Sequence, residues 1–249
     1  MIIDAHVHTG GFGGYSTADV LRLADRAGFD MIFGTDVIAL KYDMTEGNMQ
    51  LAQEMKKYPD RILGYASISS ARFERDAVDE IERCHEVYGM RGLKIVHQVV
   101  GRGSYQLLVT LNEPAMLPIL AKAAELGMLV LAHSTPEECA GLLDKVPDAK
   151  IIMAHTGGCP TALGDWFRAI EIARHYPNLY LDTASSQIDS GYIEAAVAGV
   201  GADHVVFGTD MPLLDPFFGL AKITGANLLD EEKELILGKN ILNLLGMNN

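Results

Sequence analysis

Residues 2–8 read Ile-Ile-Asp-Ala-His-Val-His, a short apolar run that ends in two histidines one residue apart. An uninterrupted apolar run of this length, rich in Ile and Val, predicts a strand that is buried on both faces. Alternate side chains of a strand point to the same face, so His6 and His8 would turn both imidazoles into one space, together with Asp4. Imidazole is a common metal ligand near neutral pH. The segment therefore predicts a buried strand that carries a candidate metal site.

Seven further apolar runs follow at intervals of about 30 residues, which suits one strand, one helix and two loops per unit. The eight predicted strands are Ile2–His8, Met31–Thr35, Ile62–Ile68, Gly92–Val96, Leu129–His133, Ile151–His155, Leu179–Asp182 and Val205–Gly208. Continuous apolarity, rather than alternation, is typical of parallel strands that are covered by helices. Eight such units predict a closed (β/α)8 barrel, the TIM barrel.

The segments between these runs carry helix start and stop signals. Thr135–Glu138 offers an N-cap threonine, a proline in the first turn and a glutamate that completes a capping box. Gly28 and Gly127 are expected to end two other helices, because glycine readily adopts the left-handed conformation of a C-cap. The last helix is expected to start at Asp230 and to stop at Gly246.

A doubly wound open sheet is the alternative architecture. It would usually have fewer strands and a Gly-rich phosphate-binding turn after the first one. Residues 9–14 instead read Thr-Gly-Gly-Phe-Gly-Gly, which has no GxGxxG register. We expect these glycines to form a loop over the pocket. No linker or low-complexity tract divides the chain, so residues 1–249 are expected to form a single domain.

Composition limits the partners of this chain. It has 249 residues, of which 49% are hydrophobic and 21% charged, as in ordinary globular proteins. The net charge of −13 argues against nucleic-acid and anionic-membrane partners. No apolar run approaches the ~20 residues of a membrane-spanning helix, and no secretory signal is seen. Three cysteines without CxxC spacing predict a reduced, cytoplasmic compartment. The expected partner is a small-molecule substrate, and a homodimer is left open.

Polar side chains gather at the predicted carboxyl ends of the strands, where barrel enzymes carry their active sites. The later strand ends carry His133, His155 and Asp210, and Lys94 lies within the fourth strand. A buried charge without a partner is costly, so Asp210 and Lys94 need an explanation. Structural alternatives stay open, because Asp210 could cap a helix and Lys94 could pair with Asp4 or Asp36.

Taken together, these strand ends resemble those of the amidohydrolase superfamily. The likeness is closest to the branch that includes aminocarboxymuconate semialdehyde decarboxylase, and it spans nearly the whole chain. The segments that carry it are Asp4–His8, Tyr58–Arg61, Ala154–Gly158, Tyr180–Thr183, Phe207–Pro212 and Gly238–Asn240.

The resemblance implies a divalent metal, with zinc as the first expectation. The implied ligands are His6, His8, His133 and Asp210, and Asp210 is also the implied proton acceptor. With a single metal, His155 would stand beside it and help to activate water. With two metals, His155 would bind the second and a carboxylated Lys94 would bridge them. The number of ions, one or two, stays open.

The resemblance and the short connection between the first two strands favour a metal-dependent hydrolase, which would use a metal-activated water on an amide, ester or lactone bond of a small molecule. The alternative is a metal-dependent, non-oxidative decarboxylase of a small unsaturated or aromatic carboxylate. A non-catalytic barrel that binds a small ligand is a third interpretation. His97, Arg102 and Trp166 are candidate substrate contacts. Arg102 could instead be a solvated loop residue, and Trp166 could instead pack a helix against the barrel.

Overall fold

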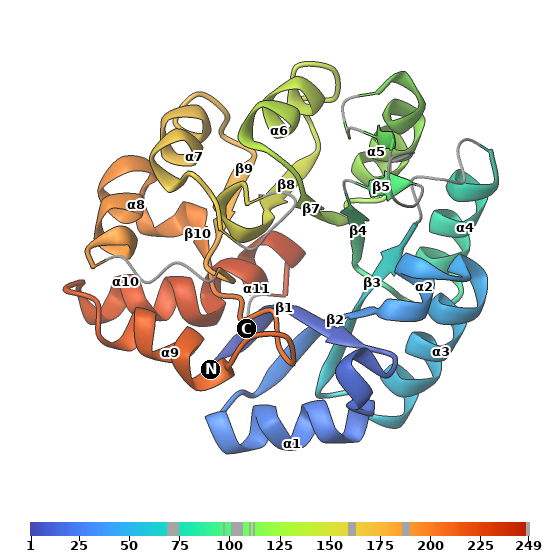
Figure 1. Ribbon diagram of the computed structural model, residues 1–249, viewed down its shortest axis with the longest axis horizontal. Coiled ribbons are helices and arrows are strands. Elements are labelled where there is room, and N and C mark those ends of the chain that lie inside the picture. Colours follow the sequence, from blue (N-terminus) through green and yellow to red (C-terminus); the bar gives the residue numbers. More distant parts are fainter. Residues whose placement is uncertain are drawn as a thin grey trace.

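The fold is a barrel of eight parallel strands (Figure 1). The computed structural model describes residues 1–68, 75–96, 98–100, 107–109, 111, 113–158, 163–185 and 190–247. The barrel strands, in their order around the sheet, are β1 (Ile3–Thr9), β2 (Met31–Asp36), β3 (Ile62–Ser67), β4 (Gly92–Val96), β7 (Leu129–His133), β8 (Lys150–Met153), β9 (Leu179–Asp182) and β10 (Val205–Val206). The predicted single-domain (β/α)8 barrel is confirmed.

Backbone hydrogen bonds bring the first and last strands together. The Ala5 amide donates to the Phe207 carbonyl at 2.9 Å, and the Asp210 amide donates to the His6 carbonyl at 2.8 Å. An isolated parallel bridge joins Val7 to Met211. Because β10 itself has only two residues, most of these bonds come from the segment that follows it. The sheet is thereby nearly closed.

Helices surround the strands as an outer layer (Figure 1). They are α1 (Thr17–Ala27), α2 (Val37–Lys41), α3 (Met44–Lys57), α4 (Arg75–Glu86), α5 (Leu117–Glu125), α6 (Pro136–Leu143), α7 (Trp166–Ala173), α8 (Tyr192–Val200), α9 (Pro216–Thr224), α10 (Asp230–Glu234) and α11 (Asn240–Leu245). A π-helical turn at Leu235–Lys239 joins α10 to α11, so the predicted last helix is one run that contains a wide turn. The predicted capping box at Thr135 is present, and Gly28 and Gly246 end their helices in the left-handed conformation.

Two strands end two residues earlier than the sequence pattern predicts. β8 ends at Met153 rather than at His155, and β10 ends at Val206 rather than at Gly208. After β8 the backbone turns at His155, which has a φ of 54°, and in the segment after β10 Asp210 has a φ of 62°. These values lie in the left-handed region, which no strand can contain. Both side chains therefore project from turns at the rim rather than from the strands.

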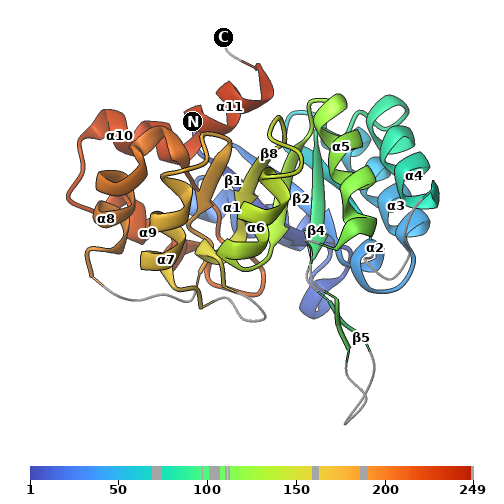
Figure 2. The same ribbon diagram turned by 90° about the horizontal axis from the view of Figure 1, so that it is seen from above.

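The segment between β4 and α5 contains two further strands. The described parts of this segment form an antiparallel hairpin of β5 (Gln98–Val100) and β6 (Leu107–Val109). The hairpin projects from the barrel beyond the end of β4, on the side away from the two chain termini (Figure 2). The two predicted substrate contacts in this segment, His97 and Arg102, lie outside the described residues.

Apolar side chains fill both sides of the sheet. One buried cluster lies between the sheet and the helices, and a second lies inside the barrel around Phe33 and Tyr65, whose rings stack at 3.6 Å. Among the helices of the described residues, none is both long and apolar enough to cross a membrane.

We expect Gly208→Ala to destabilise the fold. An added methyl group would lie 2.8 Å from the His6 Cβ and would overlap the Asp182 carboxylate. Overpacking of this kind costs about 1–3 kcal/mol, which urea unfolding would measure as a lower free energy of unfolding. Gly34→Ala in β2 is the matched control, because the nearest atom to its added methyl lies at an ordinary 3.4 Å. Equal losses of stability in the two variants would contradict this account.

Candidate metal centre

Three side chains from the two ends of the chain meet at the rim of the barrel. Ligand atoms of His6, His8 and Asp210 all lie within 4.8 Å of one another. The His8 Nε2 is 2.9 Å and the His6 Nε2 is 3.6 Å from the Asp210 Oδ1. His6 and His8 are two residues apart on β1, so the alternation of a strand places both rings on one side, as predicted.

The Asp4 carboxylate holds the two ends of this cluster together. Its Oδ1 accepts hydrogen bonds from the backbone amides of His6 at 3.1 Å and Thr209 at 2.9 Å, and its Oδ2 accepts one from the Thr209 hydroxyl. Burial raises the pKa of Asp4 to about 8, although the bonds from Thr209 act in the opposite direction. Asp4 is therefore a bridge between β1 and the turn that carries Asp210.

A second carboxylate, Asp182 at the end of β9, sets the orientation of His6. The His6 Nδ1 donates to the Asp182 Oδ2 at 2.6 Å, which leaves the Nε2 lone pair facing Asp210. Carboxylates that hold a metal-binding histidine in this way fix its tautomer and its ring orientation. Burial is the largest cause of a His6 pKa well below its usual value, so the ring is neutral. Asp182 was not among the predicted site residues, although it ends an apolar strand, as the predicted ligand His133 does.

Lys94 lies in the middle of this cluster and is 1% exposed. Its Nζ donates to the His6 Nε2 at 3.0 Å. Burial lowers the pKa of Lys94 to about 8, while the negative charges of Asp210 and Asp182 act in the opposite direction. The alternative pairings with Asp4 and Asp36 are not seen, since Asp36 instead caps α2 by accepting from backbone amides.

The remaining two predicted histidines continue the cluster, with His155 next to His6 and His133 edge-on to His155. The ring of His155 lies 4.8 Å from that of His6 and 4.7 Å from that of His133. The His155 Nδ1 donates to the Ala184 carbonyl, which can only accept, so the lone pair of a neutral His155 is on Nε2. Burial lowers the pKa of His155, and it lowers that of His133 to about 3. His133 is not part of the tight group formed by His6, His8 and Asp210.

The donor set fits a divalent metal. The His133 Nε2 is buried and has no hydrogen-bond partner within the described residues, and the buried Asp210 Oδ1 lies 2.9 Å from the His8 Nε2. A buried polar atom without a partner is costly, so such atoms call for a bound ion or ligand. Imidazole nitrogens with a carboxylate oxygen are ligands that zinc and related divalent metals accept. A second group of candidate ligand atoms comes from His6, His155 and Asp182.

Two aromatic residues, Trp166 and Phe12, bear on the substrate contacts of the site. Trp166 is 8% exposed and packs against Phe167 at 3.5 Å and Tyr192 at 5.6 Å, which favours its alternative role in helix packing. Phe12, in the Gly-rich segment after β1, stacks on the His8 ring at 5.2 Å. Phe12 was missed as a candidate, although it is the one aromatic residue within that run of glycines.

The barrel and its cluster of histidines and aspartates define a metal-binding enzyme. The family model described as Amidohydrolase matches residues 3–247, so the chain belongs to the amidohydrolase family. Among curated proteins, no sequence matches this chain.

Solved structures of similar fold cover nearly the whole chain. The 5-carboxyvanillate decarboxylase from Sphingomonas paucimobilis is 14% identical over 98% of each chain, with a TM-score of 0.77. A dihydroxybenzoic acid decarboxylase from Polaromonas, with bound manganese and 2-nitroresorcinol, is 17% identical over 100% of this chain and 97% of that chain, with a TM-score of 0.78. The 4-oxalomesaconate hydratase from Rhodopseudomonas palustris is 17% identical over 99% and 96%, with a TM-score of 0.74. At sequence identities this low, the likeness to these structures shows the fold of this chain and not its reaction.

We expect Asp182→Asn to weaken metal binding. An amide in place of the carboxylate would hold the His6 Nδ1–H less strongly, and the loss of such a partner typically lowers metal affinity about 10–100-fold. Competition with a chelator would measure the affinity for Zn²⁺ and Mn²⁺. Asp215→Asn is the control, since Asp215 caps α9 through two backbone amides. Unchanged affinity in Asp182→Asn would show that Asp182 does not support the metal, and a fall in the number of bound ions would make it a ligand.

Proposed function

We propose that this amidohydrolase-family enzyme is a metal-dependent, non-oxidative decarboxylase of a small aromatic or unsaturated carboxylate. The observation that carries the proposal is the buried amine of Lys94, placed inside the cluster of His6 and Asp210. A buried cation within a metal site suits a substrate that brings its own negative charge. Support also comes from the Sphingomonas and Polaromonas structures, which are both named as decarboxylases.

The proposed metal ligands are His6, His8, His133 and Asp210. When bound, a divalent metal would supply Lewis-acid polarisation of a substrate oxygen and would neutralise negative charge. The ion could be zinc, which the resemblance implies, or manganese, which the Polaromonas structure holds. We propose a single ion, with Lys94 beside it as an amine.

Lys94 would anchor the carboxylate of the substrate. Its ammonium form donates up to three hydrogen bonds, and a carboxylate accepts them more strongly than a neutral group does. His97 and Arg102 stay predicted contacts for the same group. The Phe12 ring, which already stacks on His8, offers a flat apolar surface to an aromatic or conjugated substrate.

His155 would supply the proton that the reaction needs. Loss of CO2 leaves an electron pair on the carbon that carried the carboxylate, and a proton must take its place. The Ala184 carbonyl keeps the His155 Nδ1 protonated, so Nε2 is the atom that picks up and delivers this proton. Burial lowers the pKa of His155, which makes its protonated form a stronger acid. The one proton consumed for each CO2 released would come from solvent, and Asp210 would accept it before it reaches the substrate.

Hydrolysis of an amide, ester or lactone bond is the second candidate. The family model carries the description Amidohydrolase. The short connection between β1 and β2 also led us to expect a hydrolase, since decarboxylases of this branch are usually longer. That argument loses force because the alignments with the decarboxylases span 97% and 98% of those chains. The non-catalytic interpretation is not supported, because the chain belongs to an enzyme family.

Variants of His133, at the end of β7, and of His155, just after β8, should distinguish metal binding from catalysis. We expect His133→Ala to lower metal occupancy, whereas His155→Ala should keep the metal and lose about 100-fold or more in kcat, as for other proton-transfer groups. Metal analysis and turnover of aromatic carboxylates, amides and lactones, with CO2 detection, would measure both. Full activity in His155→Ala would contradict its role. Release of an amine or alcohol without CO2 would identify a hydrolase instead.

Lys94 variants should distinguish an amine from a carboxylated lysine. If the amine anchors the substrate, Lys94→Met should raise KM about tenfold or more with unchanged metal content, and Lys94→Arg should recover part of the loss. If Lys94 is carboxylated, the wild type should hold two ions per chain, Lys94→Met should hold fewer, and ¹³CO2 labelling should give a carbamate signal in NMR. That second outcome would contradict the single-ion proposal.

A further inference from the structure

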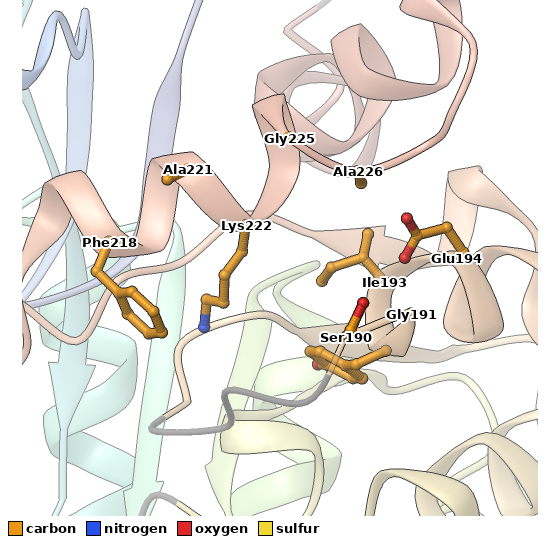
Figure 3. A pocket seen from close by; sticks show the side chains of 10 residues that line it. Ser190, Gly191, Ile193, Glu194, Phe218, Ala221, Lys222, Gly225 and Ala226 are labelled. Carbon is orange, nitrogen blue, oxygen red and sulfur yellow. The ribbon is translucent and has the colours of Figure 1, made fainter.

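Lys222 is a partly buried lysine that the proposed reaction does not use. Its side chain extends from α9 beside Phe218 (Figure 3). Its Nζ donates to the Thr183 carbonyl at 2.7 Å and to the Ser185 carbonyl at 2.9 Å. The Phe218 ring lies 5.2 Å from the same atom. Burial lowers the pKa of Lys222 to about 8, although the charge of Asp182 acts in the opposite direction. Taking the Lys222 ammonium group partly out of water costs free energy, so we expect its hydrogen bonds to have a structural or functional role.

The two carbonyls that Lys222 holds lie on either side of Ala184. The Ala184 carbonyl is the acceptor for the His155 Nδ1. The Ala184 amide in turn donates to the Asp182 Oδ1 at 2.8 Å, and the Asp182 Oδ2 accepts from His6. The short segment from Asp182 to Ser185 thus supports both histidine rings, and Lys222 fixes it from outside the barrel.

This support determines which nitrogen of His155 carries the proton. A carbonyl oxygen can only accept, so an Ala184 carbonyl held in place keeps the hydrogen on Nδ1 and the lone pair on Nε2. If the segment moved away, water could take its place and either nitrogen could carry the hydrogen. Half of the molecules or more could then present the wrong atom to the substrate.

We propose that Lys222 is a positioning residue, which fixes the tautomer of His155 by clamping the Thr183 and Ser185 carbonyls around Ala184. The inference rests on the proposed function only where it concerns turnover, because the tautomer itself can be observed without a substrate.

Lys222→Met is the direct test, since methionine keeps the length and apolar character of the side chain but donates no hydrogen bond. Histidine ¹⁵N NMR of metal-free and zinc-loaded protein should show His155 protonated on Nδ1 in the wild type and a mixture of tautomers in Lys222→Met. With a substrate, kcat should fall about 10–100-fold at unchanged metal content, because small displacements of a reacting group cost this much. Lys222→Arg should restore both readouts in part.

Lys233→Met is the matched control, because the Lys233 Nζ also donates to a carbonyl, that of Thr224, at 3.1 Å but on the exposed side of α10. It should leave the tautomer and kcat unchanged. If Lys222→Met does not fold, Lys222→Leu, which also donates no hydrogen bond, takes its place and is judged by the same NMR spectra. A folded variant with the wild-type tautomer would overturn the proposal. Absence of turnover in every protein, with the tautomer mixed only in the Lys222 variants, would overturn the proposed function and leave this inference standing.

Discussion

The Asp4 carboxylate joins parts of the chain that are 205 residues apart, and the site depends on that junction. β10 has only two residues and cannot close the barrel by strand pairing alone. Asp4 makes up for this by accepting from the amides of His6 and Thr209, so one buried side chain secures both edges of the sheet. The same bonds fix the backbone of one metal-ligand candidate and of the residue before another. The hydrogen bonds of Asp4 that close the barrel therefore also assemble the candidate metal site.

A second layer of support comes from β9. Asp182 and Ala184 hold the Nδ1 atoms of His6 and His155, and both rings turn their Nε2 atoms toward the cluster. His155 and Asp210 themselves lie in the left-handed region, a conformation that costs non-glycine residues free energy. Residues in such conformations persist only where their surroundings determine them fully. Here the surroundings are the carboxylates and carbonyls of neighbouring strands, so the positions of the reactive groups follow from the packing of the whole rim.

The sequence pattern predicted the barrel, its order of strands and the residues that meet at the rim. It could do so because buried parallel strands are continuously apolar, and a charged or imidazole side chain at the end of such a run stands out. It placed the ends of β8 and β10 two residues too late, since apolar character does not reveal where strand pairing stops, as it does before the turn at His155. It also missed Phe12 and Lys222, because a stacking ring and a lysine on an outer helix gain their meaning only from neighbours distant in sequence.

The two-residue length of β10 also has a thermodynamic consequence. The ligand candidates lie on both sides of this shortest junction of the sheet, His6 and His8 on one side and Asp210 on the other. An ion bound by His6, His8 and Asp210 would link the two sides of this junction. Its binding free energy would add to the stability of the native state by mass action. Metal-free molecules would open most readily along this line, where few backbone bonds resist separation. Occupancy of the centre would therefore be coupled to the resistance of the whole domain to unfolding.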